Sequence, residues 1–313
     1  MSDNLPLVSI LIPTYNQTKY FGRTLTSAVK QTYPNIEIII CDDSDNNEVE
    51  KMVKNYMKYY KNIKYYNNGG PLGQRGVLNG IKCFGLSNGQ YINYLFHDDV
   101  FRLNKIELMV NYFINNKDVT LVTSYRDIIG KYDEPVYTRE KFLKKTSKID
   151  GESLGLFMLS TMANIIGEPT TVMFRKSDID DEIFDYKGRK IRSYVDMAIW
   201  FKLLAKGNAI YISKPLSSFR IHENQNTHKP IIQLWGAVDC YYFIVNSYLS
   251  KEFIKSKGEY VKLIEKWLNF YMPKIKEIKH YLPKNHEEVK ELKELKEELC
   301  KCYIGAIESL PEL

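Results

Sequence analysis

The stretch "VSILIPTYNQTKYFGRTLTSAVKQTYPNIEIIICDDSDN", residues 8–46, decides the fold class. An apolar run at 8–12 leads into a segment with apolar residues at helical spacing, and a second apolar run follows at 36–41. Strands that are apolar on both faces and separated by helices are typical of a parallel sheet covered on both sides. The stretch therefore predicts an α/β fold.

The same alternation continues after this stretch. A helical segment follows Asp45 and leads to the apolar run "IKYY" at 63–66. A second helical segment, around residues 76–86, leads to the run "YINYLF" at 91–96. Polar segments follow three of the four runs, namely "PTYN", "DDSD" and "HDD". Because ligands of parallel sheets gather beyond the carboxyl ends of the strands, we expect these three segments to frame one crevice.

Each polar segment also has a simpler interpretation. "PTYN" is compatible with a turn and a helix cap at Thr18, and "DDSD" with a loop that caps the next helix. Asp98 and Asp99 of "HDD" either cap a helix beginning near Asn104, lie solvated on a loop, or meet a divalent cation. Adjacent acids repel one another, and Mg²⁺ or Mn²⁺ takes one or two protein carboxylates while substrate phosphates and water complete its shell.

The glycine-rich segment "NNGGPLGQRG", residues 67–76, lacks both a Walker lysine and the strand-GxGxxG-helix context of a dinucleotide site. It predicts a loop that lets the backbone approach a ligand, with Arg75 either contacting an anion or lying in solvent. Residues 126–165 show no clear period and predict no particular element.

A second patterned block lies between residues 167 and 222. "SYVDMAIWFKLLAKGN" predicts a helix with Asp196 in its first turn, one apolar face and a stop at Gly207. Two strand-like segments, "AIYIS" and "LSSFRIH", come next. Beyond residue 230 the chain is helical and rich in lysine, and "EYVKLIEKWLNFYMPKIKEIKHY" presents an apolar face that either lies on an anionic membrane or packs against the sheet domain.

Composition limits the function classes. The chain has 313 residues, 44% of them hydrophobic, and a formal charge of +6, which is too weak a bias to indicate nucleic acid and suits anionic substrates or a membrane surface. Its five cysteines form no CxxC pair, so we expect free thiols in a reducing compartment. No signal peptide or apolar window long enough to span a bilayer is present, so we expect a cytoplasmic protein with at most peripheral membrane contact.

The order of these motifs closely resembles that of the family 2 glycosyltransferases of GT-A fold. The resemblance rests on the stretch at 8–46, the glycine-rich loop, "GQYINYLFHDDVF", "VDMAIW" and "FRIHENQNT", and it covers roughly residues 7–225. It implies a Rossmann-like, mostly parallel sheet with helices on both faces, followed by a helical C-terminal extension. We expect a GT-A domain at 1–228, with a nucleotide-binding half to about 125 and an acceptor-side half after it, and a helical region at 229–313.

The resemblance also implies roles for individual residues in donor binding. The base and ribose of a nucleotide-sugar would be held by Pro13, Thr14, Tyr15 and Asp43, with Asp42 beside them. A carboxylate accepts a hydrogen bond from a uracil N3–H, which gives Asp43 a reason to be acidic.

A Mn²⁺ or Mg²⁺ ion is the cofactor that the resemblance implies. The metal motif of the family falls on "HDD", so Asp99 would ligate the metal and Asp98 would contact the ribose or the metal's hydration shell. His222 matches a histidine that some relatives direct at the metal or the diphosphate, and a histidine bonded to solvent is the alternative. Arg220 is a weaker phosphate candidate.

Asp196 takes the place of the family's catalytic base, although Val195 replaces the acid that often precedes it. Alone, an acid in the first turn of a helix is explained by the helix dipole and needs no catalytic role. With that role, Asp196 would deprotonate an acceptor hydroxyl as it attacks the anomeric carbon opposite the leaving diphosphate, in a single inverting displacement.

The sequence thus predicts a metal-dependent inverting transferase that moves a sugar from a nucleotide donor, most plausibly UDP, to a glycan or lipid-linked glycan. Two other classes remain. A nucleotidyltransferase uses a related sheet and metal but needs a glycine- and lysine-rich loop after the first strand, which "PTYNQTKYFG" does not supply. A catalytically inactive binding or scaffold protein on the same fold is the second.

Overall fold

The computed structural model describes residues 5–137, 140–180, 182–223, 230–283 and 285–311. The chain forms two compact units. The sheet unit comprises Met1–Gly151, Ile165–Ile183 and Lys206–Glu223, and the helical unit comprises Glu152–Asn164, Phe184–Ala205 and Asn224–Leu313. The domain boundary predicted at residue 228 lies outside the described residues.

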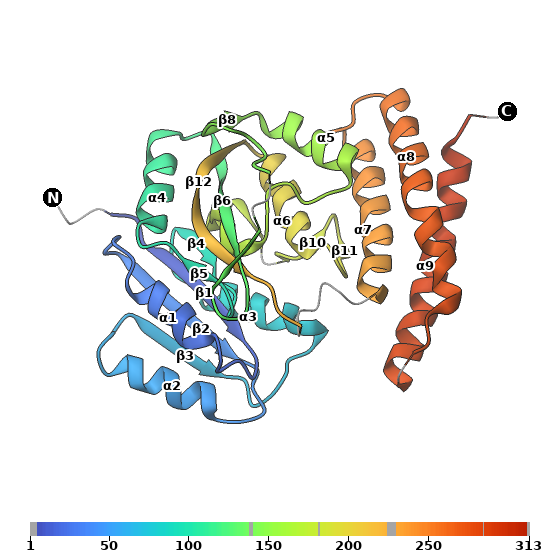
Figure 1. Cartoon of the computed structure of the whole chain (residues 1–313). Helices are drawn as coiled ribbons and strands as arrows, with labels where there is room; N and C mark the ends of the chain where they lie inside the picture. The colour runs from blue at the N-terminus through green and yellow to red at the C-terminus, as the bar shows by residue number, and fades with distance from the viewer. Residues whose placement is uncertain (1–4, 138–139, 181, 224–229, 284, 312–313) are drawn as a thin grey trace. The chain divides into compact units, whose positions relative to one another are not determined.

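A mixed sheet forms the centre of the sheet unit (Figure 1). Its strands, in spatial order, are β3 (Ile63–Asn67), β2 (Ile36–Asp42), β1 (Val8–Thr14), β4 (Tyr91–Tyr94), β9 (Met173–Arg175), β6 (Val119–Ile129), β12 (Asn208–Arg220) and β5 (Val100–Phe101). The first four are parallel, and so are β6 and β12, whereas β9 and β5 run antiparallel to their neighbours. Two short strands, β7 (Pro135–Tyr137) and β8 (Ser147–Ile149), pair with β6 and β12.

Helices cover both faces of the parallel half, as the apolar runs predicted. Side chains alternate along β1, and Val8, Ile10 and Ile12 share one apolar cluster with residues of α1 (Phe21–Val29), α2 (Glu48–Met57) and α4 (Lys105–Asn115). The opposite face meets α3 (Val77–Leu86), which contacts β1 and β2. The predicted α/β fold is confirmed.

The ends of β1, β2 and β4 lie at one edge of this sheet. Thr14 pairs with Asp42 across β1 and β2, and the N–H of Leu95 donates to the carbonyl oxygen of Leu11 (2.8 Å). The segments "PTYN", "DDSD" and "HDD" therefore emerge from the same edge, as expected from parallel strands.

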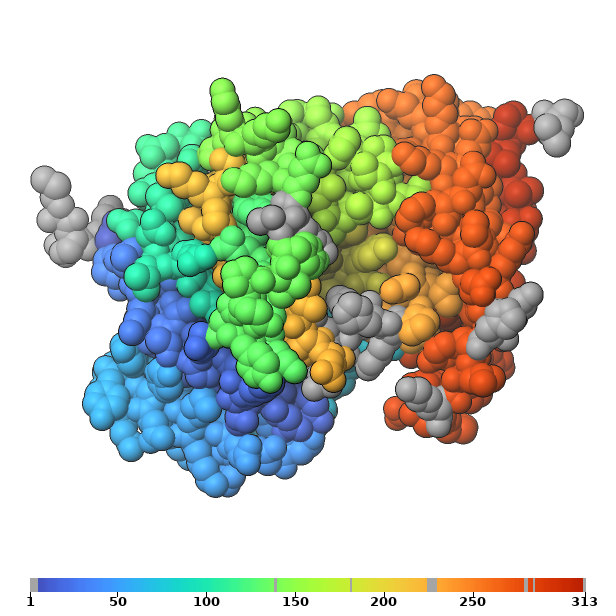
Figure 2. Space-filling model, viewed as in Figure 1, coloured from blue at the N-terminus to red at the C-terminus, as the bar shows by residue number. Residues whose placement is uncertain are grey.

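The second half of the sheet differs from the sequence prediction. The strand-like segments "AIYIS" and "LSSFRIH" belong to one strand, β12, whose register against β6 shifts around Pro215. β6 extends into the stretch that showed no clear period. Polar residues interrupt the apolar pattern of this strand, and two of them, Thr123 and Ser124, are buried. The chain from the end of β6 through β7, green in Figure 2, forms part of the surface in that view.

The helical unit contains the remaining helices. They are α5 (Gly151–Thr161), α6 (Val195–Leu204), α7 (Pro230–Leu249), α8 (Lys257–Lys276) and α9 (His286–Ser309), with a two-stranded ribbon of β10 (Asp185–Tyr186) and β11 (Arg189–Lys190). The apolar face predicted for α6, formed by Met197, Trp200, Phe201 and Leu204, is buried, and Ala198, Ile199 and Leu203 are buried as well. A helix that is apolar all round belongs in a core.

The apolar face of α8 is buried inside the helical unit. Ser256 and Glu259 form a capping box at its start, and the Trp267 indole N–H donates to the carbonyl oxygen of Ala237 in α7 (2.8 Å). α8 also contacts α9. Neither neighbour was predicted from the sequence. No helix among the described residues combines the length and the apolar composition that crossing a membrane requires.

Candidate functional site

The first part of the candidate site lies where β1 and β2 end. The Asp43 N–H donates to the carbonyl oxygen of Thr14 (2.9 Å), which continues the strand pairing by one residue. Asp42 is fully buried, and its carboxylate accepts hydrogen bonds from the Ser44 N–H (2.9 Å) and hydroxyl (2.5 Å) and from the Tyr65 hydroxyl (2.7 Å). Asp42 therefore holds the turn together from inside the protein.

Asp43 fixes the glycine-rich loop. Its carboxylate accepts hydrogen bonds from the Asn68 amide (2.7 Å) and from the backbone N–H of Leu72 (3.2 Å), and the side chain is 3% exposed. The expected base-binding acid is thus already anchored at the mouth of this loop. Charge-assisted bonds of this kind preorganise the acid.

Asn79 in α3 is a site residue that the sequence analysis missed. Its buried amide donates to the carbonyl oxygens of Thr14 (3.2 Å) and Cys41 (3.0 Å), and its own oxygen accepts a bond from Asn68 (3.0 Å). One side chain thereby joins the ends of both strands to the loop. The available signal was an asparagine within the apolar helix "VLNGIKCFGL".

Four further residues predicted to bind the donor lie in the segments around this sheet edge. Tyr15 is 47% exposed and donates from its hydroxyl to Asp45 (2.8 Å), and this hydrogen bond raises the pKa of Tyr15. Pro13 is half-buried, and the Thr14 hydroxyl oxygen is buried without a hydrogen-bond partner. Arg75 is exposed and has a left-handed φ of 54°. An unpaired buried hydroxyl at a strand end is a group that a ligand can satisfy.

Asp98 and His222 form the second part of the site. The Asp98 carboxylate lies 2.9 Å from the Nε2 atom of His222, and the two side chains are 13% and 10% exposed. Burial raises the pKa of Asp98, but the bond to His222 and the nearby His97 outweigh it, so that its pKa is lowered. Burial lowers the pKa of His97, whose Nδ1 atom is buried without a partner.

Asp99 is placed differently from its expected role as metal ligand. It is fully buried, and its two oxygens accept hydrogen bonds from the Thr170 hydroxyl (2.6 Å) and from the backbone N–H of Arg220 (3.0 Å). Burial, with the charges of Asp98 and Glu168, raises the pKa of Asp99 well above its usual value. The Asp98 carboxylate thus points toward His222, whereas Asp99 joins its own loop to Thr170 and to the end of β12. The helix that begins after Asn104 has no side-chain cap, so the capping role considered for Asp99 is not observed.

Arg220 is turned into the protein, which corrects its interpretation as a phosphate ligand. The side chain is 1% exposed, and its guanidinium donates to the backbone oxygens of Asp98 and Gly130 (both 2.8 Å) and to Asp133 (2.6 Å). It also lies over the ring of Tyr20 at 4.5 Å. These contacts fix the end of β12, two residues before His222.

The donor set suits a divalent cation. Among the residues that the structure describes, no three His, Cys, Asp or Glu side chains gather closely enough to hold a metal ion alone. The Asp98 carboxylate and the His222 imidazole are hydrogen-bonded to each other at 2.9 Å, and they would be ligands for Mn²⁺ or Mg²⁺ only once that bond opens and a diphosphate and water supply the remaining positions. Asp98 and His222 are therefore the candidate ligands among the described residues.

Asp196 lies in the helical unit. It lies in the first turn of α6, is partly buried, and accepts hydrogen bonds from the Asn164 amide (2.5 Å) and from the Met197 N–H (2.8 Å). Both bonds hold the carboxylate in one orientation. An oriented, partly exposed carboxylate is suited to accept a proton.

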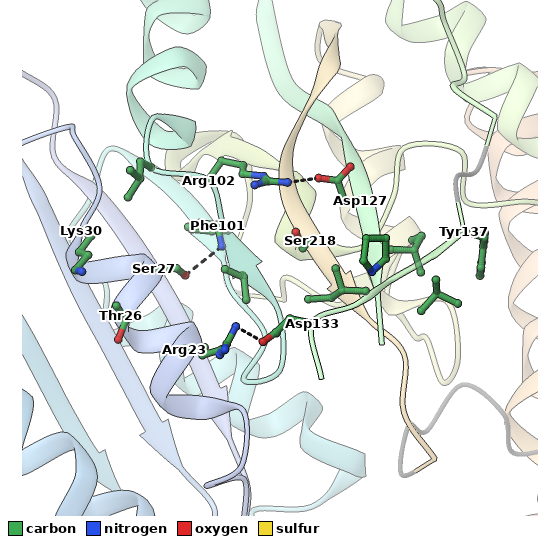
Figure 3. Close-up of a pocket in the computed structure, with 16 residues that line it drawn as sticks. Arg23, Thr26, Ser27, Lys30, Phe101, Arg102, Asp127, Asp133, Tyr137 and Ser218 are labelled. Carbon is green, nitrogen blue, oxygen red and sulfur yellow. Dashed lines mark hydrogen bonds and ion pairs between the residues drawn. The ribbon is translucent and has the colours of Figure 1, made fainter. Parts of the chain in front are cut away.

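A pocket of about 800 Å³ also lies in the sheet unit (Figure 3). Ion pairs of Arg23 with Asp133 and of Arg102 with Asp127 cross it, and Tyr137 stands at its edge. None of the predicted donor or metal residues lines it. The pocket is therefore separate from the strand-end site, although Asp133 links the two through Arg220.

Comparisons with known proteins agree with the fold. Two relatives are described as uncharacterized glycosyltransferases: that of Rickettsia prowazekii is 31% identical over 81% of this chain and 76% of its own length, and that of Rickettsia typhi is 30% identical over 73% and 68%. The chondroitin synthase of Escherichia coli is 29% identical over 44% of this chain and 21% of its own.

Solved structures of S. aureus TarS share the fold. TarS 1–349 in complex with UDP-GlcNAc superposes with a TM-score of 0.67 at 14% identity, covering 97% of this chain and 81% of that one. A longer TarS structure gives a TM-score of 0.65 at 16% identity, and this chain spans about half of it, 49%. The predicted GT-A fold is thereby confirmed.

The family model described as "Glycosyl transferase family 2" matches residues 9–181, which include both strand-end segments and the "HDD" motif. The resemblance inferred from the motif order is confirmed, and with it the general class of transferase. The chain belongs to glycosyl transferase family 2.

Proposed function

We propose that this protein is an inverting glycosyltransferase that uses a UDP-sugar and a divalent cation. The observation that carries the proposal is the pairing of Asp98 with His222 at the sheet edge from which the segments around Thr14 and Asp43 also emerge. The TarS fragment of similar fold was crystallised in complex with UDP-GlcNAc, which supports a uridine nucleotide as the donor.

In this proposal the sheet unit holds the donor. Asp43 accepts a hydrogen bond from the base, Thr14 and Tyr15 line the nucleotide, and Arg75 contacts the diphosphate. Asp98 and His222 hold Mn²⁺ or Mg²⁺, and Asp99 supports them by tying the loop to Thr170 and β12. When bound, the cation neutralises negative charge on the departing diphosphate.

Asp196 is the proposed catalytic base. Its two hydrogen bonds, from Asn164 and from the Met197 N–H, orient the carboxylate without neutralising it. It removes the proton of an acceptor hydroxyl while the oxygen attacks the anomeric carbon and the bond to the diphosphate breaks. One displacement of this kind inverts the anomeric configuration.

For the acceptor we propose a hydroxyl of a glycan or lipid-linked glycan. The similarity to a chondroitin synthase supports a polysaccharide product. The net charge of +6 supports peripheral contact with an anionic membrane surface, and we propose a cytoplasmic location. Nucleic acid is not part of this proposal.

The first experiment measures thermal stability with Mn²⁺ and a panel of UDP-, GDP- and dTDP-sugars. A bound donor raises the melting temperature by mass action, so we expect an increase with a UDP-sugar and metal together. Stabilisation by a GDP-sugar alone would contradict the donor assignment. Release of UDP rather than pyrophosphate then separates a glycosyltransferase from a nucleotidyltransferase.

The second experiment tests the base. Asp196→Asn keeps the size and the bond from the Met197 N–H but cannot accept a proton, so we expect UDP affinity to stay within about twofold while turnover falls at least about a hundredfold. Calorimetry and UDP release measure the two quantities. Undiminished turnover in this variant would remove Asp196 as the base, and a wild-type protein that binds UDP without turnover would indicate a binding or scaffold role.

A further inference from the structure

The loop that leads into α6 is held by helices far along the chain. Asp239, on α7, is fully buried, and its carboxylate accepts hydrogen bonds from three consecutive backbone N–H groups, those of Arg192 (3.2 Å), Ser193 (2.7 Å) and Tyr194 (3.0 Å). These are the residues immediately before α6, which begins at Val195. Tyr194, at the N-cap position of α6, makes no side-chain cap of its own.

The three N–H groups belong to the loop and to the N-cap residue Tyr194, so Asp239 does not cap the first turn of α6. A buried carboxylate that accepts three consecutive backbone N–H groups instead fixes the path of the loop into the helix. Asp239 does this from another helix, 43 residues after Asp196 in the sequence. Burial raises the pKa of Asp239 to about 6 against the lowering effect of these three bonds.

Side chains of the same loop are clamped by α7 and α9. Arg189 lies over the ring of Tyr242 at 3.4 Å and pairs with Glu298 at 2.5 Å. Arg192 lies over the ring of Trp235 at 4.5 Å and pairs with Glu294 at 3.4 Å. Each arginine therefore meets one aromatic residue of α7 and one acid of α9.

The Tyr194 ring is seated against α7 as well. A methyl group built on Gly236 would lie 2.8 Å from its Cζ atom, so α7 carries no side chain where the ring sits. The Tyr194 hydroxyl lies 3.4 Å from that of Tyr271 in α8. The backbone, the charged side chains and the ring of this loop are thus held mainly by α7 and α9, and α8 contacts only the Tyr194 hydroxyl.

We propose that Asp239 is a positioning residue for the transfer reaction, and that α7 and α9 form a platform that holds the loop 189–194 and thereby aims Asp196. This inference rests on the proposed role of Asp196 as the base, and it gives the helical region 229–313 a function that its sequence did not predict. A base displaced by about 1 Å loses on the order of a hundredfold in rate.

The test compares variants of the full chain. Asp239→Ala removes all three bonds, Asp239→Asn keeps an oxygen that accepts some of them, and Trp267→Phe loosens α8 from α7 without touching the loop. With Mn²⁺ and UDP-GlcNAc, UDP release gives kcat and KM. We expect kcat to fall about tenfold or more in Asp239→Ala and less in Asp239→Asn, KM to change less than about twofold, and Trp267→Phe to keep its kcat.

Hydrogen exchange gives a readout that does not depend on turnover. The amides of Arg192, Ser193 and Tyr194 should exchange at least about tenfold faster in Asp239→Ala and remain slow in Trp267→Phe. The inference is wrong if folded Asp239→Ala keeps its kcat, if these amides stay protected, or if Trp267→Phe loses kcat equally.

Asp196→Asn separates the two levels of the proposal. If that variant loses turnover while Asp239→Ala keeps it, only the positioning role fails. If Asp196→Asn retains turnover, the base assignment itself fails, whatever the exchange data show.

Discussion

Two adjacent acids of the "HDD" motif have different environments. Asp98 faces His222 and retains some exposure, whereas Asp99 is fully buried and bonded through both oxygens to Thr170 and to the backbone of Arg220. Two adjacent acids can follow a buried strand because only Asp98 faces the proposed cation, whereas burial and the charge of Asp98 raise the pKa of Asp99 and favour its neutral form. Asp99 joins the loop after β4 to β12.

The two acids are therefore expected to respond differently to mutation. Asp98→Asn should weaken Mn²⁺-dependent UDP binding at least about tenfold with little change in stability, because a charged ligand is lost at a partly exposed position. Asp99→Ala should cost about 1–3 kcal/mol of stability, because the buried Thr170 hydroxyl and the Arg220 N–H both lose their acceptor. Calorimetry with and without Mn²⁺ measures the UDP affinity, and urea unfolding measures the stability. The reverse pattern would indicate that Asp99, and not Asp98, is the metal ligand.

Among whole elements, α3 carries a residue that ties β1, β2 and the glycine-rich loop together. Asn79→Ala should lower the free energy of unfolding by about 2–4 kcal/mol, since the carbonyl oxygens of Thr14 and Cys41 both lose a buried donor. UDP affinity should fall as well, because those strand ends belong to the proposed donor site. Urea unfolding and calorimetry test the two effects, and a variant as stable as wild type would show that water replaces the amide.

Gly85 on the same helix provides a contrast. It is exposed, and no heavy atom lies within 4 Å of the position its Cβ would take. Gly85→Ala should therefore stabilise the protein by about 0.5–1 kcal/mol through helix propensity alone. UDP affinity should stay unchanged, and a loss of stability would mean that the helix end needs the freedom of glycine.

Particular elements show how far the sequence predicts this structure. β1, β2, β4 and α3 are recognisable because fully buried strands and an adjacent helix have strong local signals. β6 was missed because it buries two polar residues, Thr123 and Ser124. The Thr123 hydroxyl donates to the carbonyl oxygen of Ile166, a tertiary contact that no local pattern records.

The residues of the candidate site were predictable from motifs, but their contacts were not. The motifs named Asp98, His222 and Asp196, but which oxygen faces solvent depends on contacts made across the fold. Arg220 was read as a phosphate ligand because its guanidinium partners, the backbone oxygens of Asp98 and Gly130, come from distant segments. Asp239 had no local signal at all, since its partners lie 45–47 residues earlier.

At the scale of the whole molecule, each unit has its own buried core and its own buried charges. In the helical unit, Asp239 is a buried acid on α7, and the residues on either side of it in the chain, Val238 and Cys240, are also buried. A carboxylate in that position costs free energy when charged, and three backbone bonds and the nearby Arg189 offset only part of the cost. The acid that we propose to position Asp196 should therefore also make global stability depend on pH.

The sign of that dependence follows from the pKa of Asp239, which rises from 3.8 to about 6 on folding. The folded state binds the proton more tightly, so the contribution of Asp239 to stability is fully present below about pH 4 and is lost as the pH rises through about 6. The shift corresponds to about 3 kcal/mol. Asp239→Asn cannot titrate, so the free energy of unfolding of wild type relative to this variant should fall by that order between pH 4 and 7, as measured by urea unfolding at several pH values. A difference that stays constant across this range, or that grows with pH, would show that the buried carboxylate is charged throughout and that its three backbone bonds outweigh its burial.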